Sequence, residues 1–125
     1  MTDTLKDPLT IADKAFSSRL LIGSAGYPNN QLMLDSIAAS GADIVTVAIR
    51  RISLEGGAET MIDLLAGDYH ILPNTAGCSN AEEAIRVARL GRELAKLAGQ
   101  EENNFVKLEV IPDSRHLLPD PIGTL

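Results

Sequence analysis

A lysine and a glutamate share one face of an extended stretch near the end of the chain. In the segment 105–110, side-chain alternation places Lys107 and Glu109 on one face and their apolar neighbours on the other. Burial favours the neutral form of a lysine amine, and a neutral amine attacks a carbonyl carbon to form an imine. A carboxylate two residues along the same face, about 7 Å away at its base, is placed to move protons on that imine. The pair therefore predicts Schiff-base chemistry.

The same alternation has a second interpretation that involves no chemistry. A strand at the edge of a sheet also alternates, with its polar face in water and its apolar face on the core. A lysine and a glutamate two residues apart are common on such ordinary surfaces. The pattern of Lys107 and Glu109 alone leaves both interpretations open.

Four short apolar runs indicate the elements that position this pair. They begin near Leu20, Ile44, Tyr69 and Phe105, which are 24, 25 and 36 residues apart, and helical patterns lie between them. That spacing is typical of successive βα units with parallel strands, as in an open doubly wound sheet or a closed eight-stranded barrel. The loop 23–26 lacks the glycine pattern of dinucleotide-binding folds. In a barrel, Lys107 and Glu109 would face the lumen near the carboxyl end of their strand, where barrel enzymes build their sites.

Local signals predict the bounds of several elements. We expect a flexible N-terminus over residues 1–8 and one domain over residues 9–125. Apolar runs on both sides of residues 12–14 indicate a hairpin. The remaining signals, in chain order, predict a helix capped by Asn29 or Asn30 and closed by Gly41, a loop over 50–57, a helix over 58–65, a helix from 79 to 98 that begins with a capping box of Ser79 and Glu82, and a strand over 105–111.

Composition excludes several classes of partner. The net charge is −6 and the sequence pI is about 4.8, so the chain lacks the basic stripe that nucleic-acid binding requires. The single Cys78 makes neither an internal disulfide nor a metal cluster, and we expect no metal and no cofactor. The chain start shows no signal-peptide pattern, and the apolar runs fall short of the roughly 20 residues of a membrane helix. We therefore expect a cytoplasmic protein with no membrane association.

Several ordered motifs follow one another along the chain. They are Leu32–Ile37 with Ser40–Asp43, Val45–Arg51, Leu72–Gly77 with Ala81–Ala84, and Val106–Asp113 followed by Leu117–Pro121. Together these motifs resemble the bacterial thiazole synthases. The similarity covers about residues 9 to 125, at natural spacing, and any one motif alone would not suffice.

The resemblance implies a (β/α)8 TIM barrel, of which this chain holds the N-terminal half with about four βα units. It also implies an enzyme of thiamine biosynthesis that forms thiazole phosphate from 1-deoxy-D-xylulose 5-phosphate, a glycine-derived imine and the thiocarboxylate of a sulfur carrier protein. By position, Lys107 is the lysine that forms the Schiff base and Glu109 the acid/base carboxylate. Asn74 and Thr75, at the end of the third strand, are placed to bind substrate at the same mouth.

The chain departs from the family pattern in two places. The family usually has G-T-G-K-Y after its first strand, whereas this chain has G-S-A-G-Y over 23–27 and so lacks that lysine. A complete barrel takes about 250 residues, so the family's second catalytic carboxylate and phosphate-binding loops are expected outside these four units. Unpaired strand edges predict a homo-oligomer. The alternative function is a non-catalytic half-barrel module that contacts a full-length synthase or the sulfur carrier protein.

Overall fold

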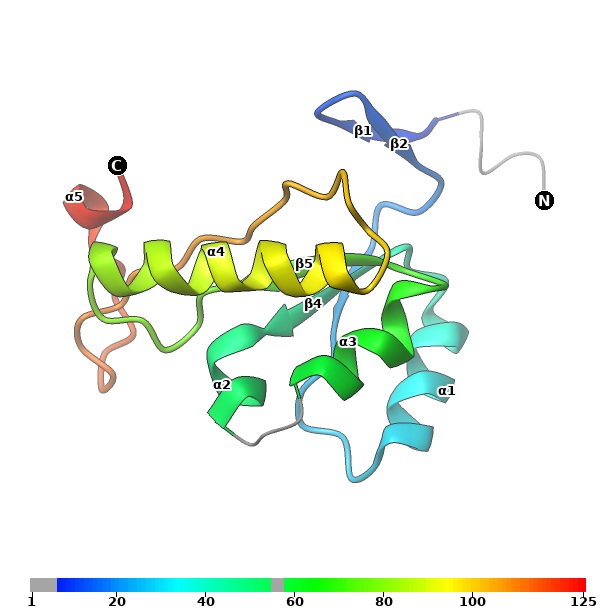
Figure 1. The fold of residues 1–125 in the computed structure, drawn as a ribbon, viewed down its shortest axis with the longest axis horizontal. Coiled ribbons are helices and arrows are strands. Elements are labelled where there is room, and N and C mark those ends of the chain that lie inside the picture. The colour runs from blue at the N-terminus through cyan, green and yellow to red at the C-terminus, as the bar shows by residue number, and fades with distance from the viewer. Residues whose placement is uncertain (1–6, 55–57) are drawn as a thin grey trace.

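A parallel three-stranded sheet lies at the centre of the computed structural model, which describes residues 7–54 and 58–125. Its strands are β3 (Leu21–Gly23), β4 (Ile44–Ala48) and β5 (His70–Asn74), in the spatial order β3-β4-β5 (Figure 1). All pairs are parallel, which confirms the predicted succession of βα units for these strands. The flexibility expected for the N-terminus falls largely on residues 1–6, outside the described ranges.

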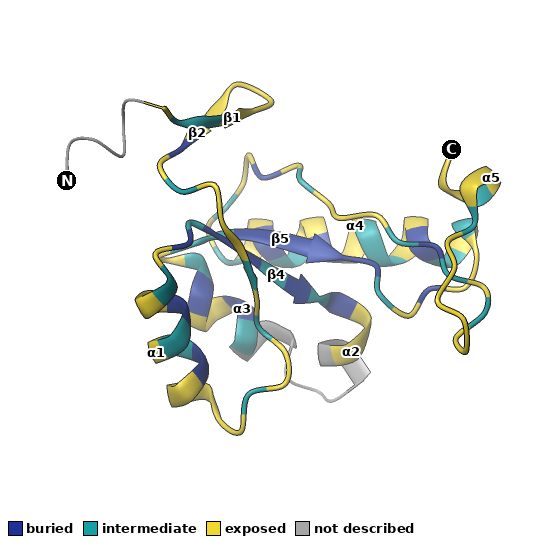
Figure 2. Cartoon of the chain, turned by 180° about the vertical axis from the view of Figure 1, so that it is seen from behind, coloured by how far each residue is buried: buried dark blue, intermediate teal, exposed yellow. Residues whose placement is uncertain are grey.

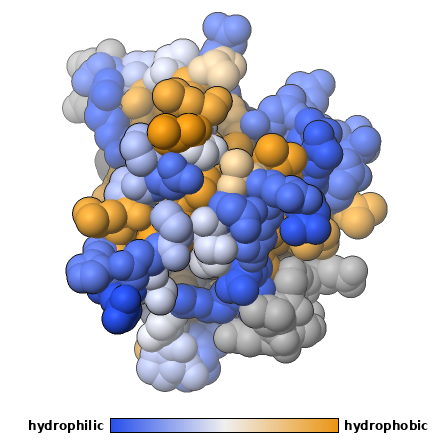
Figure 3. Space-filling view, turned by 90° about the vertical axis from the view of Figure 1, so that its left-hand side faces the viewer, coloured by the Kyte–Doolittle hydropathy of each residue, from blue (hydrophilic) through white to orange (hydrophobic). Residues whose placement is uncertain are grey.

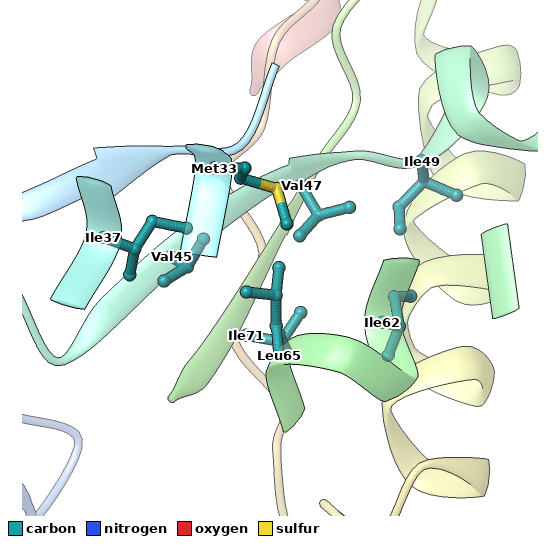
Figure 4. Packing of buried hydrophobic residues seen from close by; sticks show 8 residues of the cluster. All are labelled: Met33, Ile37, Val45, Val47, Ile49, Ile62, Leu65 and Ile71. Atoms are coloured by element: carbon teal, nitrogen blue, oxygen red, sulfur yellow. The ribbon is translucent and has the colours of Figure 1, made fainter. Parts of the chain in front are cut away.

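Helices cover one face of this sheet, and none of the described residues forms a helix on the opposite face (Figures 1 and 2). They are α1 (Asn30–Ser40), α3 (Ala58–Ala66) and α4 (Ala81–Leu97). The apolar core lies between the two layers and is built mainly from β-branched residues and leucine, which suit a sheet buried under helices. Its buried members are Met33, Ile37, Val45, Val47, Ile49, Ile62, Leu65 and Ile71 (Figure 4).

Helix α4 approaches the sheet closely at Gly91. A Cβ atom built on this glycine would lie 2.7 Å from Cβ of Pro73 and 3.0 Å from Cγ1 of Ile49. The neighbouring Ala84 and Ala95 on the same face are also buried. Small residues on this face therefore let the helix lie close to the sheet.

The helix ends follow local capping chemistry. Asn29 caps α1 by accepting a hydrogen bond from the backbone N–H of Leu32, and Gly41 closes the helix with a φ of 74°. Both were predicted. Helix α4 begins one residue later than the capping-box pattern indicated, because Asn80 accepts the hydrogen bond from the N–H of Glu83.

Two further elements differ from or add to the predicted set. The loop expected over residues 50–57 is wrong in its described part, which forms helix α2 (Ile49–Leu54); residues 55–57 lie outside the described ranges. Near the end of the chain, Asp120 caps the short helix α5 (Pro121–Thr124).

An N-terminal hairpin closes one end of the helix-free face. Strands β1 (Leu9–Ile11) and β2 (Lys14–Phe16) pair antiparallel around Ala12 and Asp13, whose φ angles are 48° and 65°. Positive φ at both central residues is the geometry that suits a two-residue hairpin. Phe16 then packs on Ile44 and Leu72, at the beginning of β4 and in β5.

The predicted regular strand over residues 105–111 is wrong. Only an isolated parallel bridge forms there, between Asn74 and Lys107. The neighbouring edge of β5 explains this result. Pro73 has no N–H to donate, and the backbone groups of Ile71 are already bonded to the side chains of Gln100 and Asn103, at 3.1 and 2.7 Å. A continuous ladder therefore has too few free partners.

Candidate active site

Lys107 lies beside the carboxyl end of β5. Its backbone N–H donates to the carbonyl oxygen of Pro73 at 2.8 Å, and its carbonyl accepts from the N–H of Thr75 at 3.2 Å. Asn74 is its bridge partner and is in turn the register partner of Ala48 in β4. Ala48, Asn74 and Lys107 thus form one row across the carboxyl end of the sheet.

The side chain of Lys107 belongs to the helix-free face of the sheet. Register partners in neighbouring strands direct their side chains to the same face, so Lys107 and Asn74 share one. Two residues earlier on each segment, Phe105 and Leu72 pack in the cluster under Phe16, away from the helices. This agrees with the face that alternation predicted for Lys107 and Glu109.

Lys107 and Glu109 form an ion pair. Nζ of Lys107 lies 3.2 Å from Oε1 of Glu109, and the two side chains are 52% and 25% exposed. The two groups therefore lie within hydrogen-bonding distance of each other. The burial expected for the lysine is wrong in this structure, since half of its side chain meets solvent.

Backbone contacts hold Glu109 in place. The hydroxyl of Thr75 accepts a hydrogen bond from the N–H of Glu109 at 2.7 Å and donates one to the carbonyl oxygen of Glu109 at 2.7 Å. Thr75 is fully buried. Further along, the N–H of Ile111 donates to the carbonyl oxygen of Cys78 at 3.0 Å.

Asn74 completes the group of residues singled out in the sequence. Its side chain is buried, and its Oδ1 accepts a hydrogen bond from the N–H of Ala76 at 3.1 Å, which fixes the turn after β5. The structure therefore brings Asn74, Thr75, Lys107 and Glu109 together at one end of the sheet. Thr75 is joined to the other three residues by the hydrogen bonds of its hydroxyl to the backbone of Glu109.

Charged neighbours that the site prediction did not include lie on the helix side of this end. Nε of Arg50 lies 3.0 Å from Oε1 of Glu83, and the two side chains form an ion pair. Cys78 lies buried next to them, and its pKa is raised by desolvation and by the negative charge of Glu83. A raised pKa lowers the reactivity of this thiol as a nucleophile.

Within the described ranges, no group of three or more histidine, cysteine or acidic side chains is arranged to hold a metal ion. Nor does any helix within those ranges have the length and apolar character needed to cross a membrane.

Comparison with known proteins identifies relatives along nearly the whole chain. Residues 10–125 match the family described as "Thiazole biosynthesis protein ThiG". A thiazole synthase of Synechococcus sp. (strain CC9605) is 62% identical over 123 residues, and one of Trichodesmium erythraeum (strain IMS101) is 57% identical over 128 residues. These alignments cover 95% and 99% of this chain but 44% and 45% of the relatives. A "Bifunctional protein ThiO/ThiG" of Nostoc sp. is 60% identical over 124 residues, 98% of this chain and 19% of that protein. The chain thus spans about half the length of the thiazole synthases that it matches.

Proposed function

The chain belongs to the ThiG family of thiazole synthases, and on that premise we propose that Lys107 and Glu109 are the imine-forming pair of a thiazole synthase active site. The observation that carries the proposal is the 3.2 Å contact between the two side chains on the helix-free face of a parallel sheet. The carboxyl end of the strands is where barrel enzymes gather their catalytic groups. We propose that the three strands and the Lys107 segment are consecutive parts of such a barrel.

The proposed reaction begins at the ketone of 1-deoxy-D-xylulose 5-phosphate. The half-exposed Lys107 ammonium loses a proton to solvent, and the free amine attacks the ketone carbon, while Glu109 stays ionised. Loss of water gives the imine, in which the nitrogen has replaced the ketone oxygen. The imine acidifies the C–H bond on the neighbouring carbon C3, and Glu109 removes that proton as the imine tautomerises. Asn74, in the same row as Lys107, lines the space where the sugar carbons lie.

The remaining substrates follow from the family. We propose that a glycine-derived imine and sulfur from the thiocarboxylate of a carrier protein join the sugar-derived intermediate to make thiazole phosphate. The setting that we propose is the cytoplasm, in keeping with a cysteine that is free and buried among the described residues.

We further propose that the chain self-associates. One edge of the sheet is β3, which pairs with a neighbouring strand on one side only. The Lys107 segment lies along the other edge, beside β5. Apolar side chains near α5 are also exposed, among them Ile122 at 85%. Figure 3 faces the end of the molecule that carries α5 and shows apolar surface among hydrophilic groups. Size-exclusion chromatography with light scattering should give more than one copy per particle, and a stable folded monomer would contradict this part of the proposal.

Reductive trapping tests the imine directly. The chain is incubated with 1-deoxy-D-xylulose 5-phosphate and sodium borohydride, digested, and analysed by mass spectrometry. The proposal requires the added mass of the reduced sugar phosphate on the peptide that contains Lys107. Lys107→Arg, which keeps the positive charge but cannot form the imine, should take up none, while Lys96→Arg should behave as wild type because Lys96 is exposed on α4. Absence of adduct in a sample folded by circular dichroism would instead favour the non-catalytic module.

A further inference from the structure

The fully buried hydroxyl of Thr75 bonds to both backbone groups of Glu109. Its oxygen accepts from the Glu109 N–H and donates to the Glu109 carbonyl, each at 2.7 Å, although the two residues are 34 positions apart. Threonine hydroxyls can serve once as donor and twice as acceptor. Here one side chain replaces both bonds that a neighbouring strand would supply.

This contact matters because the segment that carries Glu109 is not a regular strand. Strand β5 ends at Asn74, and the backbone bridge to the segment is at Lys107. The next backbone bonds along the segment run from the N–H of Asp120 to the carbonyl oxygen of Val110, at 2.8 Å, and from the N–H of Ile111 to the carbonyl oxygen of Cys78, at 3.0 Å. On Glu109 itself, within the described part of the chain, the Thr75 hydroxyl supplies the bonds to both backbone groups.

Thr75 also binds the other member of the pair. Its backbone N–H donates to the carbonyl oxygen of Lys107 at 3.2 Å, and its own carbonyl accepts from the N–H of Cys78 at 3.1 Å. One buried residue therefore fixes the backbone on both sides of Leu108. The separation of the Lys107 and Glu109 side chains depends on the backbone at these two positions.

We propose that Thr75 is a positioning residue, which sets the place of the Glu109 carboxylate relative to Lys107 and does not itself contact substrate. This rests on the proposed function of the pair. The direct substrate-binding role expected from the sequence would need a hydroxyl that faces the open sheet surface, whereas this hydroxyl is enclosed and bonded to Glu109. Proton transfer by Glu109 is more sensitive to this placement than imine formation at Lys107, because Lys107 keeps its own bonds to β5.

Thr75→Val and Thr75→Ser form a matched pair for the test. Valine keeps the branched shape and removes the hydroxyl, while serine keeps the hydroxyl. Two activities are measured with 1-deoxy-D-xylulose 5-phosphate: borohydride trapping at Lys107, and exchange of the C3 hydrogen for deuterium in heavy water. In Thr75→Val we expect C3 exchange to fall about tenfold or more and trapping to change by less than about threefold. Thr75→Ser should restore C3 exchange to near the wild-type rate. A merely structural defect would lower both activities together.

Amide hydrogen exchange of the segment 105–111 gives a readout that needs no substrate. Loss of a typical hydrogen bond, about 1 kcal/mol, corresponds to about fivefold, so exchange in this segment should quicken by about that factor in Thr75→Val and not in Thr75→Ser. Equal exchange in all three proteins, or a serine variant that behaves like the valine variant, overturns the proposal. If the wild-type chain traps no sugar phosphate, the proposed function fails, and the amide exchange still decides whether Thr75 positions Glu109. Thr75→Ala replaces the valine variant if the latter does not fold by circular dichroism.

Discussion

The contact between α4 and the sheet at Gly91 yields a prediction with a defined magnitude. In Gly91→Ala, the new methyl carbon would lie 2.7 Å from Cβ of Pro73 and 3.0 Å from Cγ1 of Ile49. Carbon atoms pack at about 3.5–4.0 Å, so the overlap approaches 1 Å. Pro73 and Ile49 are both fully buried.

Two opposing terms set the expected change in the free energy of unfolding. Overpacking a close-packed core costs about 1–3 kcal/mol, with a stiff proline ring placing this site toward the upper end. Alanine recovers about 1 kcal/mol of helix propensity relative to glycine. The expected net loss of stability is therefore about 1–2 kcal/mol.

Urea unfolding followed by circular dichroism measures this change at a fixed protein concentration. The matched control is Gly67→Ala, since a Cβ at Gly67 meets nothing within 4 Å and the residue is not in the left-handed region. We expect the control to lie within about 0.5 kcal/mol of the wild type. A Gly91→Ala protein as stable as the wild type would refute the close packing inferred for α4.

Three further predictions rest on individual polar groups. Asp43 accepts hydrogen bonds from the Ser18 N–H and the Ser17 hydroxyl, which lower its pKa. The stability that it contributes is present above its unfolded pKa of about 3.9 and is lost as the pH falls through the lower folded pKa. Asp43→Asn should therefore unfold more easily than wild type at pH 7 by up to about 1 kcal/mol, with the difference vanishing in urea titrations at strongly acid pH. Desolvation lowers the pKa of His70, so the unfolded chain binds more protons below about pH 6.5; thermal melts of wild type should lose stability between pH 7.5 and 5.5 more steeply than those of His70→Leu. Asn80→Ala removes the cap of α4 and should cost about 1 kcal/mol in the same urea assay, whereas an equal stability would show that the cap is dispensable.

Much of the fold was predictable because its signals are local. The caps at Asn29 and Gly41 lie within a few residues of the groups that they serve, and the strand Ile44–Ala48 is a continuous β-branched run. Alternation alone also placed Lys107 on the correct face of its segment. In each case the information lies within one turn or one strand of the residue concerned.

The unpredicted features depend on residues far apart in the sequence. The segment 105–111 has a strand-like pattern, but whether it forms a ladder depends on the edge that it meets. That edge contains Pro73 and the bonds of Gln100 and Asn103 to Ile71, which no pattern within 105–111 reveals. The enclosed hydroxyl of Thr75 was likewise hidden, because its partner lies 34 positions away. A proline in the neighbouring strand was the one available warning.

The hairpin gives the sheet face a closed end and an approachable end. Phe16, His70 and Phe105 meet edge-on, with ring centroids 4.7–6.1 Å apart, near the start of β4. Lys107 lies level with Ala48, four residues further along β4, or about 13 Å at strand rise. Small molecules therefore reach the amine from the side remote from β1 and β2. A surface tether or affinity tag joined ahead of the hairpin would therefore lie at the end of the sheet face that carries the three aromatic rings. It would leave the opposite end, where Lys107 lies, unobstructed.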